Sequence, residues 1–331
     1  MTTLITGGAG YIGSHTALAL RDAGQDVVIL DDISTGFHQL LPSGVPFIEG
    51  DIGDSTLLQE VFQSYGINSV MHFAARSLVG ESMQEPGTYF LANTAKTATL
   101  LQTMAQVGVK YFILSSTAAV YGEPRALPID ENHPLQPTNP YGLSKKLIED
   151  MLPWFEKAQG LQWISLRYFN AAGADSQGRS GEMHDPETHL IPNILKVALG
   201  EKEALQIFGN DYPTPDGTCI RDYVHVTDLA KAHMQALEYL RASEKSGFSR
   251  NDICSGPMNL GSSSGYSVLE VIETARRVTQ HPIPLQWSPR RPGDPAVLVA
   301  SNEKAKEVLQ WQPEHNNLET IIETAWRFAR K

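Results

Sequence analysis

The stretch of sequence that decides the fold is residues 3–13, which read TLITGGAGYIG. A short apolar run leads into glycines at positions 7, 10 and 13, and a helical pattern then continues to Leu20 and stops at Gly24. The first glycine permits a tight turn, the second lets backbone N–H groups approach a phosphate, and the third lets the helix pack closely on the strand. A dinucleotide pyrophosphate needs this arrangement. The glycine triplet alone would also fit a loop that merely requires positive φ angles.

Two acids after the second apolar run favour the dinucleotide interpretation. Residues 27–30 are followed by Asp31 and Asp32, and Asp31 lies 31 − 13 = 18 residues past Gly13, close to the ~20 expected for the acid that hydrogen-bonds an adenosine ribose. A carboxylate there repels a 2′-phosphate, so the pattern favours NAD over NADP. The alternative is a pair of exposed turn aspartates. Asp51, after the third apolar run, is a second expected contact near the adenine.

Short apolar runs alternate with longer helical patterns through the first half of the chain, as in parallel strands joined by crossover helices. We therefore predict an α/β fold, with a Rossmann-type doubly wound parallel sheet and a smaller α/β C-terminal substrate domain. The expected domains are residues 1–173, which bind NAD, and 174–331, with about 221–240 returning to pack on the first domain. The expected strands are residues 3–6, 27–30, 47–48, 70–73, 111–115 and 163–166. Ligands of such sheets sit outside the carboxyl ends of the strands, so we expect the site there.

Composition restricts the class of partner. The 331 residues include 26 basic and 37 acidic side chains, a net charge of −11. A diffuse excess of carboxylates repels nucleic-acid backbones and anionic lipid, so we expect neither a nucleic-acid nor a membrane partner. No apolar run approaches the ~18 residues of a membrane span, and no basic leader precedes the first strand. With Cys219 and Cys254 as its two cysteines, the chain is not a disulfide scaffold, and a cytoplasmic location is expected.

A tyrosine and a lysine stand at helical spacing after Pro140, a residue that favours a helix start. Tyr141 and Lys145 are i and i+4, hence neighbours on one helix face. A phenol has a pKa of ~10, too high for a base at neutral pH, but an adjacent ammonium and a cationic nicotinamide both favour the phenolate. Residues 115–117, SST, offer hydroxyls at a strand end to the same site. Alone, such a pair is most often solvated, but its position downstream of the glycine turn favours a catalytic base.

Together these motifs resemble the extended short-chain dehydrogenase/reductase superfamily. Residues 167–170 (RYFN), 207–212 (IFGNDY), 221–230 (RDYVHVTDLA) and 290–294 (RRPGD) narrow the resemblance to its nucleotide-sugar epimerase branch, and within it to the UDP-glucose 4-epimerases. The matching motifs run from Thr6 to Trp311, essentially the whole chain. The resemblance implies interconversion of UDP-galactose and UDP-glucose in galactose metabolism, through a transient 4-keto sugar, with NAD tightly bound and regenerated in each turnover.

The resemblance also implies roles for the residues already singled out. Tyr141 would take the proton of the sugar 4-hydroxyl while hydride passes to bound NAD. Lys145 would hold the nicotinamide ribose and lower the pKa of the tyrosine, and Thr117 would hydrogen-bond the 4-oxygen. The implied cofactor-binding residues are Gly7, Gly10, Tyr11, Ile12, Gly13, Asp31, Asp32, Ser34, Thr35, Gly36, Asp51, Ile52, Phe73, Ala74, Ala75, Ser77, Thr117, Tyr141, Lys145 and Phe169.

Residues of the second half would bind the UDP-sugar. Arg221 and Arg291 match pyrophosphate-binding arginines of the family and suit bidentate contacts, although a salt bridge from Arg221 to Asp222 or Asp228 is the alternative. Asp294 matches an acid that binds ribose. The implied substrate-binding residues are Thr117, Tyr141, Asn170, His189, Leu190, Gln206, Ile207, Phe208 (suited to stacking on a base), Arg221, Arg291, Asp294 and Leu298.

Several positions depart from the commonest pattern of the family. Thr117 stands where Ser is commonest, so it keeps the hydroxyl and adds a methyl group. Ala118 and Ala119 stand where related 4,6-dehydratases carry an Asp-Glu pair, so elimination of the 6-hydroxyl is not expected. Leu298 is intermediate in size at the position associated with admitting N-acetylated sugars. Epimerisation of UDP-N-acetylhexosamines or of a UDP-uronate therefore remains an alternative.

Other choices also stay open. Either Arg76 or Ser77 would meet the cofactor pyrophosphate. A net oxidoreductase of the same fold, or a non-enzymatic sensor of NAD or a sugar nucleotide, is a further alternative, although such sensors tend to lose the Tyr–Lys pair. We expect no metal, because no third ligand is spaced with His184 and His189. His233 is expected to be a core histidine, and a homodimer is expected through residues 88–107 and the Tyr141 helix.

Overall fold

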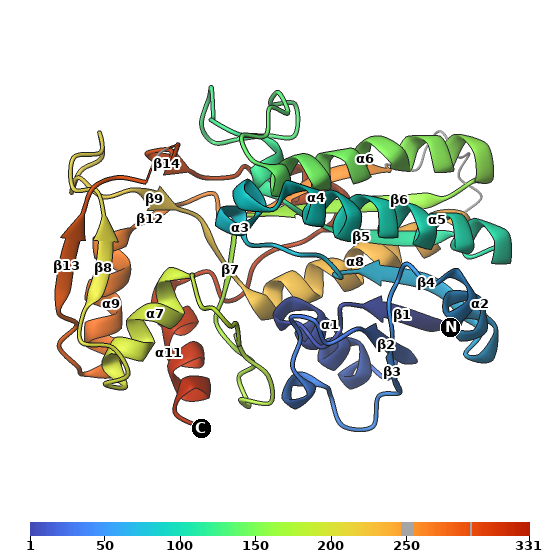
Figure 1. Cartoon of the computed structure of the whole chain (residues 1–331), viewed down its shortest axis with the longest axis horizontal. Coiled ribbons are helices and arrows are strands. Elements are labelled where there is room, and N and C mark those ends of the chain that lie inside the picture. The colour runs from blue at the N-terminus through green and yellow to red at the C-terminus, as the bar shows by residue number, and fades with distance from the viewer. Residues whose placement is uncertain (246–254, 292) are drawn as a thin grey trace.

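The computed structural model of the chain describes residues 1–245, 255–291 and 293–331, without the side chains of residues 244 and 245. Cys254 and Pro292, named above, lie outside the described residues. A sheet of seven parallel strands forms the centre of the molecule, in the order β11-β6-β5-β4-β1-β2-β3 (Figure 1). Its strands are β1 (Thr2–Thr6), β2 (Val27–Asp31), β3 (Phe47–Glu49), β4 (Ile67–His72), β5 (Tyr111–Thr117), β6 (Gln162–Tyr168) and β11 (Gly256–Leu260). The predicted doubly wound sheet and its six expected strands are confirmed, and β11 was missed.

Helices cover both faces of this sheet. Successive residues of β1 point to opposite faces, so Leu4 packs with α2 (Ser55–Ser64), α5 (Lys96–Val107) and α6 (Pro140–Gln159). Ile5 packs instead with α1 (Tyr11–Asp22), α8 (Val226–Lys245) and α10 (Glu303–Leu309). Both side chains are fully buried, which explains why the strands read as continuous apolar runs. Two short helices, α3 (Val79–Gln84) and α4 (Pro86–Tyr89), lie against α6.

A smaller α/β region lies at the left of Figure 1. There α7 (Leu190–Ala198), α9 (Val268–Thr279) and α11 (Leu318–Ala329) pack with β8 (Leu205–Phe208) and β13 (Leu285–Ser288). Two small sheets join the regions: β7 (Asn170–Ala172) pairs with β10 (Tyr223–His225), and β9 (Ile220–Arg221) lies between β12 (Tyr266–Ser267) and β14 (Val297–Leu298). After residue 173 the chain returns to the large sheet through α8 and through β11. The division at residue 173 stays a prediction.

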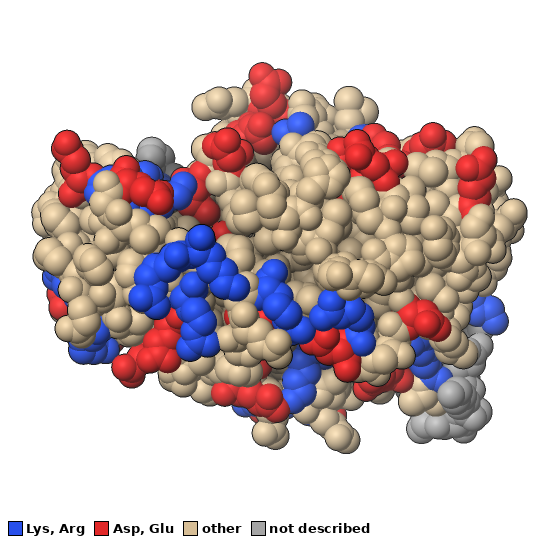
Figure 2. Space-filling view, turned by 90° about the horizontal axis from the view of Figure 1, so that it is seen from below, with Lys and Arg blue, Asp and Glu red and all other residues tan. Residues whose placement is uncertain are grey.

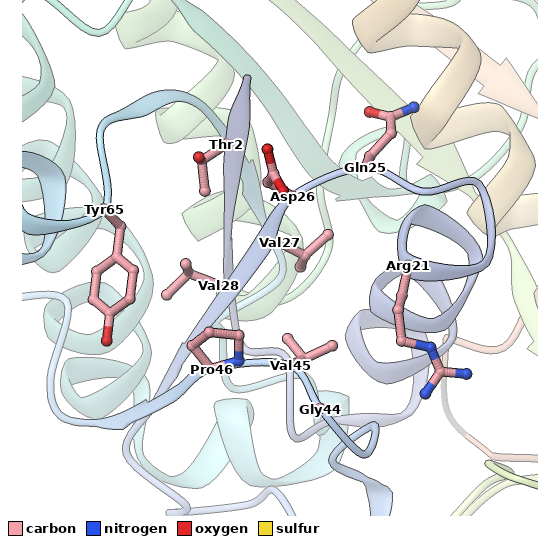
Figure 3. Close-up of a pocket in the computed structure, with 10 residues that line it drawn as sticks. All are labelled: Thr2, Arg21, Gln25, Asp26, Val27, Val28, Gly44, Val45, Pro46 and Tyr65. Carbon is pink, nitrogen blue, oxygen red and sulfur yellow. The ribbon is translucent and has the colours of Figure 1, made fainter.

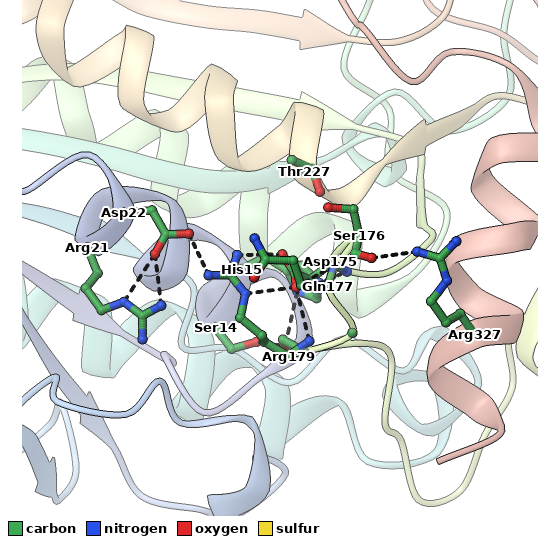
Figure 4. Close-up of polar contacts among 12 residues, drawn as sticks. Ser14, His15, Arg21, Asp22, Asp175, Ser176, Gln177, Arg179, Thr227 and Arg327 are labelled. Atoms are coloured by element: carbon green, nitrogen blue, oxygen red, sulfur yellow. Dashed lines mark hydrogen bonds and ion pairs between the residues drawn. The ribbon is translucent and has the colours of Figure 1, made fainter.

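Polar contacts fix the loop after β7 between the two regions (Figure 4). Arg179 donates to Asp175 from Nε (2.9 Å) and Nη2 (2.7 Å), and its Nη1 pairs with Asp22 at the end of α1 at 2.7 Å. Arg327 of α11 donates to the carbonyl oxygen of Ser176 at 2.7 Å. The loop of residues 174–180 is therefore attached both to α1 and to α11.

Charged side chains are mixed on the face seen from below. Figure 2 shows lysine and arginine side chains gathered near the middle of this face, with aspartate and glutamate side chains beside them. The acidic excess of the chain thus leaves room for local basic sites. None of the described helices has the length and apolar character needed to cross a membrane.

Candidate active site

The glycine turn lies where the strand order reverses, between β1 and β4. Gly7 follows β1 with φ +76°, and a Cβ atom there would lie 2.4 Å from the backbone nitrogen of Ala74, which follows β4. A Cβ atom at Gly13 would lie 2.2 Å from the carbonyl oxygen of Gly7. Gly10 precedes α1 and gives it no side-chain cap, so the first N–H groups of the helix stay available to an anion. The turn therefore offers backbone N–H groups to an anion at the carboxyl end of the sheet, and its role as a pyrophosphate site stays a prediction.

The acids at the end of β2 and just after β3 lie at the same edge. Asp31 is buried, and its carboxylate accepts from the backbone nitrogens of Ala9 and Ile33, each at 2.9 Å. Burial raises the pKa of Asp31, and these hydrogen bonds oppose the shift. The loop that holds it thus lies against the glycine turn, whereas Asp32 is exposed and bonds to Ser34. Asp51 pairs with Lys96.

The other positions implied for the cofactor differ in what they offer. The Tyr11 hydroxyl donates to the carbonyl oxygen of Gly173 at 2.6 Å, so it fixes the start of α1 to the loop after β7. The ring of Phe73 lies 4.7 Å from that of His233, which is a buried core histidine, as expected. Ser77 is exposed, and Arg76 Nη1 lies 3.4 Å from Glu81. Ile52 is buried, Thr35 is exposed, and Ile12, Gly36 and Ala75 are half-buried.

The Tyr–Lys pair lies at the start of α6, whose first residue is Pro140, as predicted. Lys145 is buried, and its Nζ donates to the carbonyl oxygen of Ser115 in β5 at 2.9 Å. Burial lowers the pKa of Lys145 to about 8, against the opposing charge of Glu149. Burial also raises the pKa of Tyr141, which a side-chain hydrogen bond from Thr117 lowers. The structure thus brings Tyr141, Lys145 and Thr117 together.

A buried network behind this pair was missed by the sequence analysis. The Glu149 carboxylate accepts from Ser116 Oγ and Ser165 Oγ, each at 2.6 Å, and from Arg167 Nε at 3.0 Å. Glu149 stands four residues after Lys145 on α6, so the helical spacing was the available signal. The network fixes α6 to β5 and β6.

Both arginines implied for the UDP-sugar, Arg221 and Arg291, already contact other side chains. Arg221 forms an ion pair with Asp294 and donates from Nη1 to the carbonyl oxygen of Ile220 at 2.7 Å. Arg221 does not pair with Asp222 or Asp228, the partners considered above. Asp222 instead accepts from residues 262 and 300, and Asp228 accepts from residue 315. The guanidinium of Arg291 lies 4.0 Å from the centre of the Phe208 ring.

The remaining implied positions are spread around the second region. Asn170 donates from Nδ2 to the carbonyl oxygen of Asp222 at 2.8 Å, which fixes β7 beside β10. Ile207 is buried in the core of the smaller region, and Gln206 is exposed and bonds to Ser288 at 2.8 Å. His189 precedes α7, which begins at Leu190, and its pairs with two glutamates outweigh burial and raise its pKa to about 10.

One apolar cluster joins the two halves of the site. Val120, Tyr121 and Ile129 are buried, and Ala118, Leu135, Phe169 and Leu298 pack against them. Because Ala118 follows Thr117 directly, this cluster places Leu298 of β14 near the end of β5. A position implied for sugar specificity thus shares an apolar cluster with the residue next to Thr117.

A separate hollow lies at the opposite end of the strands (Figure 3). It has a volume of about 320 Å³, and its lining includes Thr2 and Val27, the first residues of β1 and β2. Ligands of parallel sheets bind at the carboxyl ends of the strands, so this hollow is not part of the candidate site.

Comparisons with known proteins agree with this geometry. A family model described as GDP-mannose 4,6 dehydratase matches residues 4–324. A relative from Halalkalibacterium halodurans, described as UDP-glucose 4-epimerase, is 53% identical over 331 residues, which span 100% of this chain and 96% of the relative. The crystal structure of UDP-glucose 4-epimerase from Brucella ovis in complex with NAD is similar with a TM-score of 0.93 and 42% identity, over 99% of this chain and 98% of that chain. The structure of UDP-glucose 4-epimerase from Bifidobacterium longum with NAD⁺ and UDP has a TM-score of 0.91 and 38% identity, over 100% and 98%.

Proposed function

The chain belongs to the family of UDP-glucose 4-epimerases, and we propose that Tyr141, Lys145 and Thr117 are the groups through which it acts. It is an isomerase that interconverts UDP-galactose and UDP-glucose with NAD as its cofactor. The observation that carries the residue assignment is the meeting of α6 with the end of β5, where Lys145 bonds to the backbone two residues before Thr117.

Tyr141 accepts the proton of the sugar 4-hydroxyl. Because burial raises the pKa of its phenol, the phenolate needs positive charge nearby, and Lys145 supplies it one helical turn along α6. Thr117 Oγ1 accepts from the backbone nitrogen of Ala119 at 3.1 Å, so its own hydrogen remains for donation to Tyr141 or to the sugar 4-oxygen. When bound, NAD would supply the hydride acceptor and donor for the sugar C4 and the positive charge of its oxidised ring.

The chain holds the cofactor at the edge where β1 and β4 part. The glycine turn and the uncapped start of α1 bind the pyrophosphate, Asp31 binds the adenosine ribose, and Asp51 lies near the adenine. A Cβ atom at Gly7 would collide with the backbone of Ala74, and one at Gly13 with the carbonyl oxygen of Gly7, so the shape of the turn requires glycine at both positions.

The second region holds the UDP group. Arg221 and Arg291 bind the pyrophosphate, Asp294 binds the uridine ribose, and the half-buried ring of Phe208 stacks on the uracil. The pair between Arg221 and Asp294 holds the guanidinium in place before substrate arrives. The contact of Arg291 with Phe208 does the same for the second arginine.

Leu298 supports a second candidate activity on UDP-N-acetylhexosamines. Its half-buried side chain packs on the cluster that contains Ala118, beside the catalytic strand end. Leu298→Ser would enlarge this space, and we expect kcat/KM for UDP-N-acetylgalactosamine to rise relative to that for UDP-galactose. Leu298→Tyr is the matched control and should lower the ratio. An equal ratio in all three proteins would reject the role of Leu298.

We further propose that the enzyme is a cytoplasmic homodimer. Leu91 and Trp154 are 67% and 70% exposed, and Leu143 and Leu147 add exposed apolar surface on α6. In Figure 1, α5 and α6 lie along the same side of the molecule. Sedimentation should give a dimer that Leu147→Glu weakens, and a wild-type monomer would reject this interface.

The buried free thiol of Cys219 suits a reducing compartment, which cell fractionation tests.

The activity is tested with the purified protein and UDP-galactose alone. Formation of UDP-glucose is followed without added reductant, and the reverse reaction is started from UDP-glucose. Both should approach the same equilibrium mixture with no net accumulation of reduced cofactor. Absence of interconversion in folded protein that contains NAD would reject the function, and stoichiometric accumulation of reduced cofactor would favour a net oxidoreductase.

A further inference from the structure

Four side chains converge on the loop that precedes α7, outside the groups used above apart from His189. Residues 182–189 read EMHDPETH, and ligand atoms of Glu182, His184, Glu187 and His189 all lie within 4.8 Å of one another. In the sequence, no third ligand is evident at metal-binding spacing from the two histidines. That premise is wrong, because the fold of the loop brings both glutamates to them.

The distances between these atoms suit a single cation among them. His184 Nδ1 lies 3.3 Å from Glu182 Oε1 and 3.5 Å from Glu187 Oε2. His189 Nδ1 lies 2.9 Å from Glu182 Oε1 and 2.9 Å from Glu187 Oε1. Four ligands placed ~2.0–2.1 Å from a tetrahedral ion are separated by about 3.3–3.4 Å. The four histidine–glutamate separations lie near this value, and Glu187 faces the two histidines with different oxygens, so small side-chain adjustments would bring one atom of each residue into a tetrahedral set.

Each histidine Nδ1 faces both glutamates, and one N–H can point at only one carboxylate at a time. His184 Nδ1 is buried and lies 3.3 and 3.5 Å from the two carboxylates without the alignment of a hydrogen bond. His189 Nδ1 faces two carboxylates at equal distance, but a single N–H can point at only one. The Glu182 and Glu187 side chains are 8% and 3% exposed, and in the described part of the chain neither pairs with a lysine or arginine. A bound cation would satisfy all four groups at once.

Two further contacts of this loop hold the four side chains in place. The Glu187 carboxylate also accepts from the backbone nitrogen of His189 at 2.7 Å, which orients it toward the histidines as an outer contact does in metal sites. The His184 ring lies 6.2 Å from the Tyr11 ring at the start of α1. The cluster thus sits where the loop meets the first turn of α1.

A second group of acids and histidine offers a comparison within the same chain. Asp228, Glu314 and His315 also lie close together, but Asp228 accepts from the backbone nitrogen of His315 at 2.8 Å and from its Nδ1 at 3.1 Å. Glu314 pairs with Lys231. These groups are satisfied without an ion, so this group serves as the control.

We propose that Glu182, His184, Glu187 and His189 bind one divalent cation of the zinc class, in a four-coordinate site. Two imidazole nitrogens select zinc over magnesium or calcium, which prefer oxygen ligands. Four protein ligands leave no open position, so the ion is structural. It fixes the loop of residues 182–189 against α1 and so fixes the start of α7 at Leu190. The site does not depend on the proposed epimerase mechanism.

Zinc binding is measured directly on the full chain. Chelator-treated wild-type protein is titrated with Zn²⁺, and metal content is determined after dialysis. We expect one tightly bound zinc per chain in the wild-type protein. In His184→Ala zinc binding should be at least ~100-fold weaker, because loss of outer contacts alone costs about 10–100-fold. In His315→Ala zinc binding should equal that of the wild type. Equal affinity in wild type and His184→Ala would overturn the site, and so would loss of zinc in His315→Ala alone.

A second measurement needs no variant. Co²⁺ added to the chelator-treated wild-type chain should give the intense visible absorption of a four-coordinate ion, and one equivalent of Zn²⁺ should abolish it. Mg²⁺ in excess should leave the spectrum unchanged. A weak six-coordinate spectrum, or no binding of either ion, would mean that protonated imidazoles alone hold the glutamates and would overturn the proposal.

Discussion

Lys145 Nζ donates a hydrogen bond of 2.9 Å to the carbonyl oxygen of Ser115, which joins the first turns of α6 to the end of β5. The bond has a buried donor, and it holds Tyr141 one helical turn earlier, beside Thr117. The arrangement of the proposed base therefore depends on the packing of a helix on a strand.

Removing the phenol hydroxyl of Tyr141 should abolish the proton transfer and leave NAD binding unchanged. For Tyr141→Phe we expect kcat to fall by ~10²–10⁴-fold, the usual contribution of a positioned acid or base. NAD content, measured on the denatured protein, should stay at the wild-type level because no backbone contact of the glycine turn changes. Full activity in this variant would contradict the assignment of Tyr141.

The hydroxyl of Thr117, and not its methyl group, should matter. Thr117→Ser keeps the hydroxyl and should stay within a few-fold of wild-type kcat. Thr117→Val keeps the shape but loses the oxygen that accepts from the backbone nitrogen of Ala119 and the hydrogen offered to Tyr141, so we expect a fall of at least ~10-fold. Steady-state kinetics of the pair provide the check, and equal losses in both variants would point to packing instead.

The role of the glycine turn in NAD binding can be tested by adding one methyl group. A Cβ atom at Gly13 would lie 2.2 Å from the carbonyl oxygen of Gly7, so Gly13→Ala should displace the turn, lower NAD content and cost about 1–3 kcal/mol in the free energy of unfolding. Gly80→Ala is the matched control, because nothing lies within 4 Å of the added atom and α3 should gain stability. Normal NAD content in Gly13→Ala would argue against pyrophosphate binding at this turn.

The fold was predictable where the signal is local. The glycine turn, the apolar runs of six strands and the Pro140 start of α6 each depend on a few consecutive residues. The strand β11 was not predicted because its five residues, GPMNL, include Pro257 and Asn259 and show no apolar run. It is a strand because it pairs with β6 at the sheet edge, which is a tertiary effect.

The sequence offers candidate site residues but not the contacts between them. The Arg221–Asp294 pair joins residues 73 positions apart, and sequence alone offered only the nearer acids as partners. The cluster around His184 needs the loop to fold back so that Glu182 and Glu187 meet it. Spacing in the sequence does not reveal such a reversal.

Buried neutral histidines predict that stability falls in mild acid. Burial lowers the pKa of His15 and of His233 from 6.5 to about 4. Between these values the unfolded chain binds protons that the folded chain does not, so the free energy of unfolding is unaffected by these groups above pH 6.5 and falls as the pH drops from 6.5 towards 4. We expect a loss on the order of 1–2 kcal/mol per histidine between pH of about 7.5 and about 5.

Urea unfolding at the two pH values measures this loss. In His233→Phe, which keeps a ring beside Phe73 and Tyr168, one histidine's share of the pH dependence should disappear. An unchanged pH dependence would show that His233 titrates alike in the folded and unfolded chain.

The central claim is that the hydrogen removed from the sugar C4 returns to the same carbon, while Tyr141 handles only the hydroxyl proton. The most direct test uses UDP-galactose that carries deuterium at C4, incubated with the purified chain in ordinary water, and analysis of the UDP-glucose formed by mass spectrometry and NMR. We predict that the product keeps deuterium at C4 in full. Replacement of that deuterium by hydrogen from water would contradict the account.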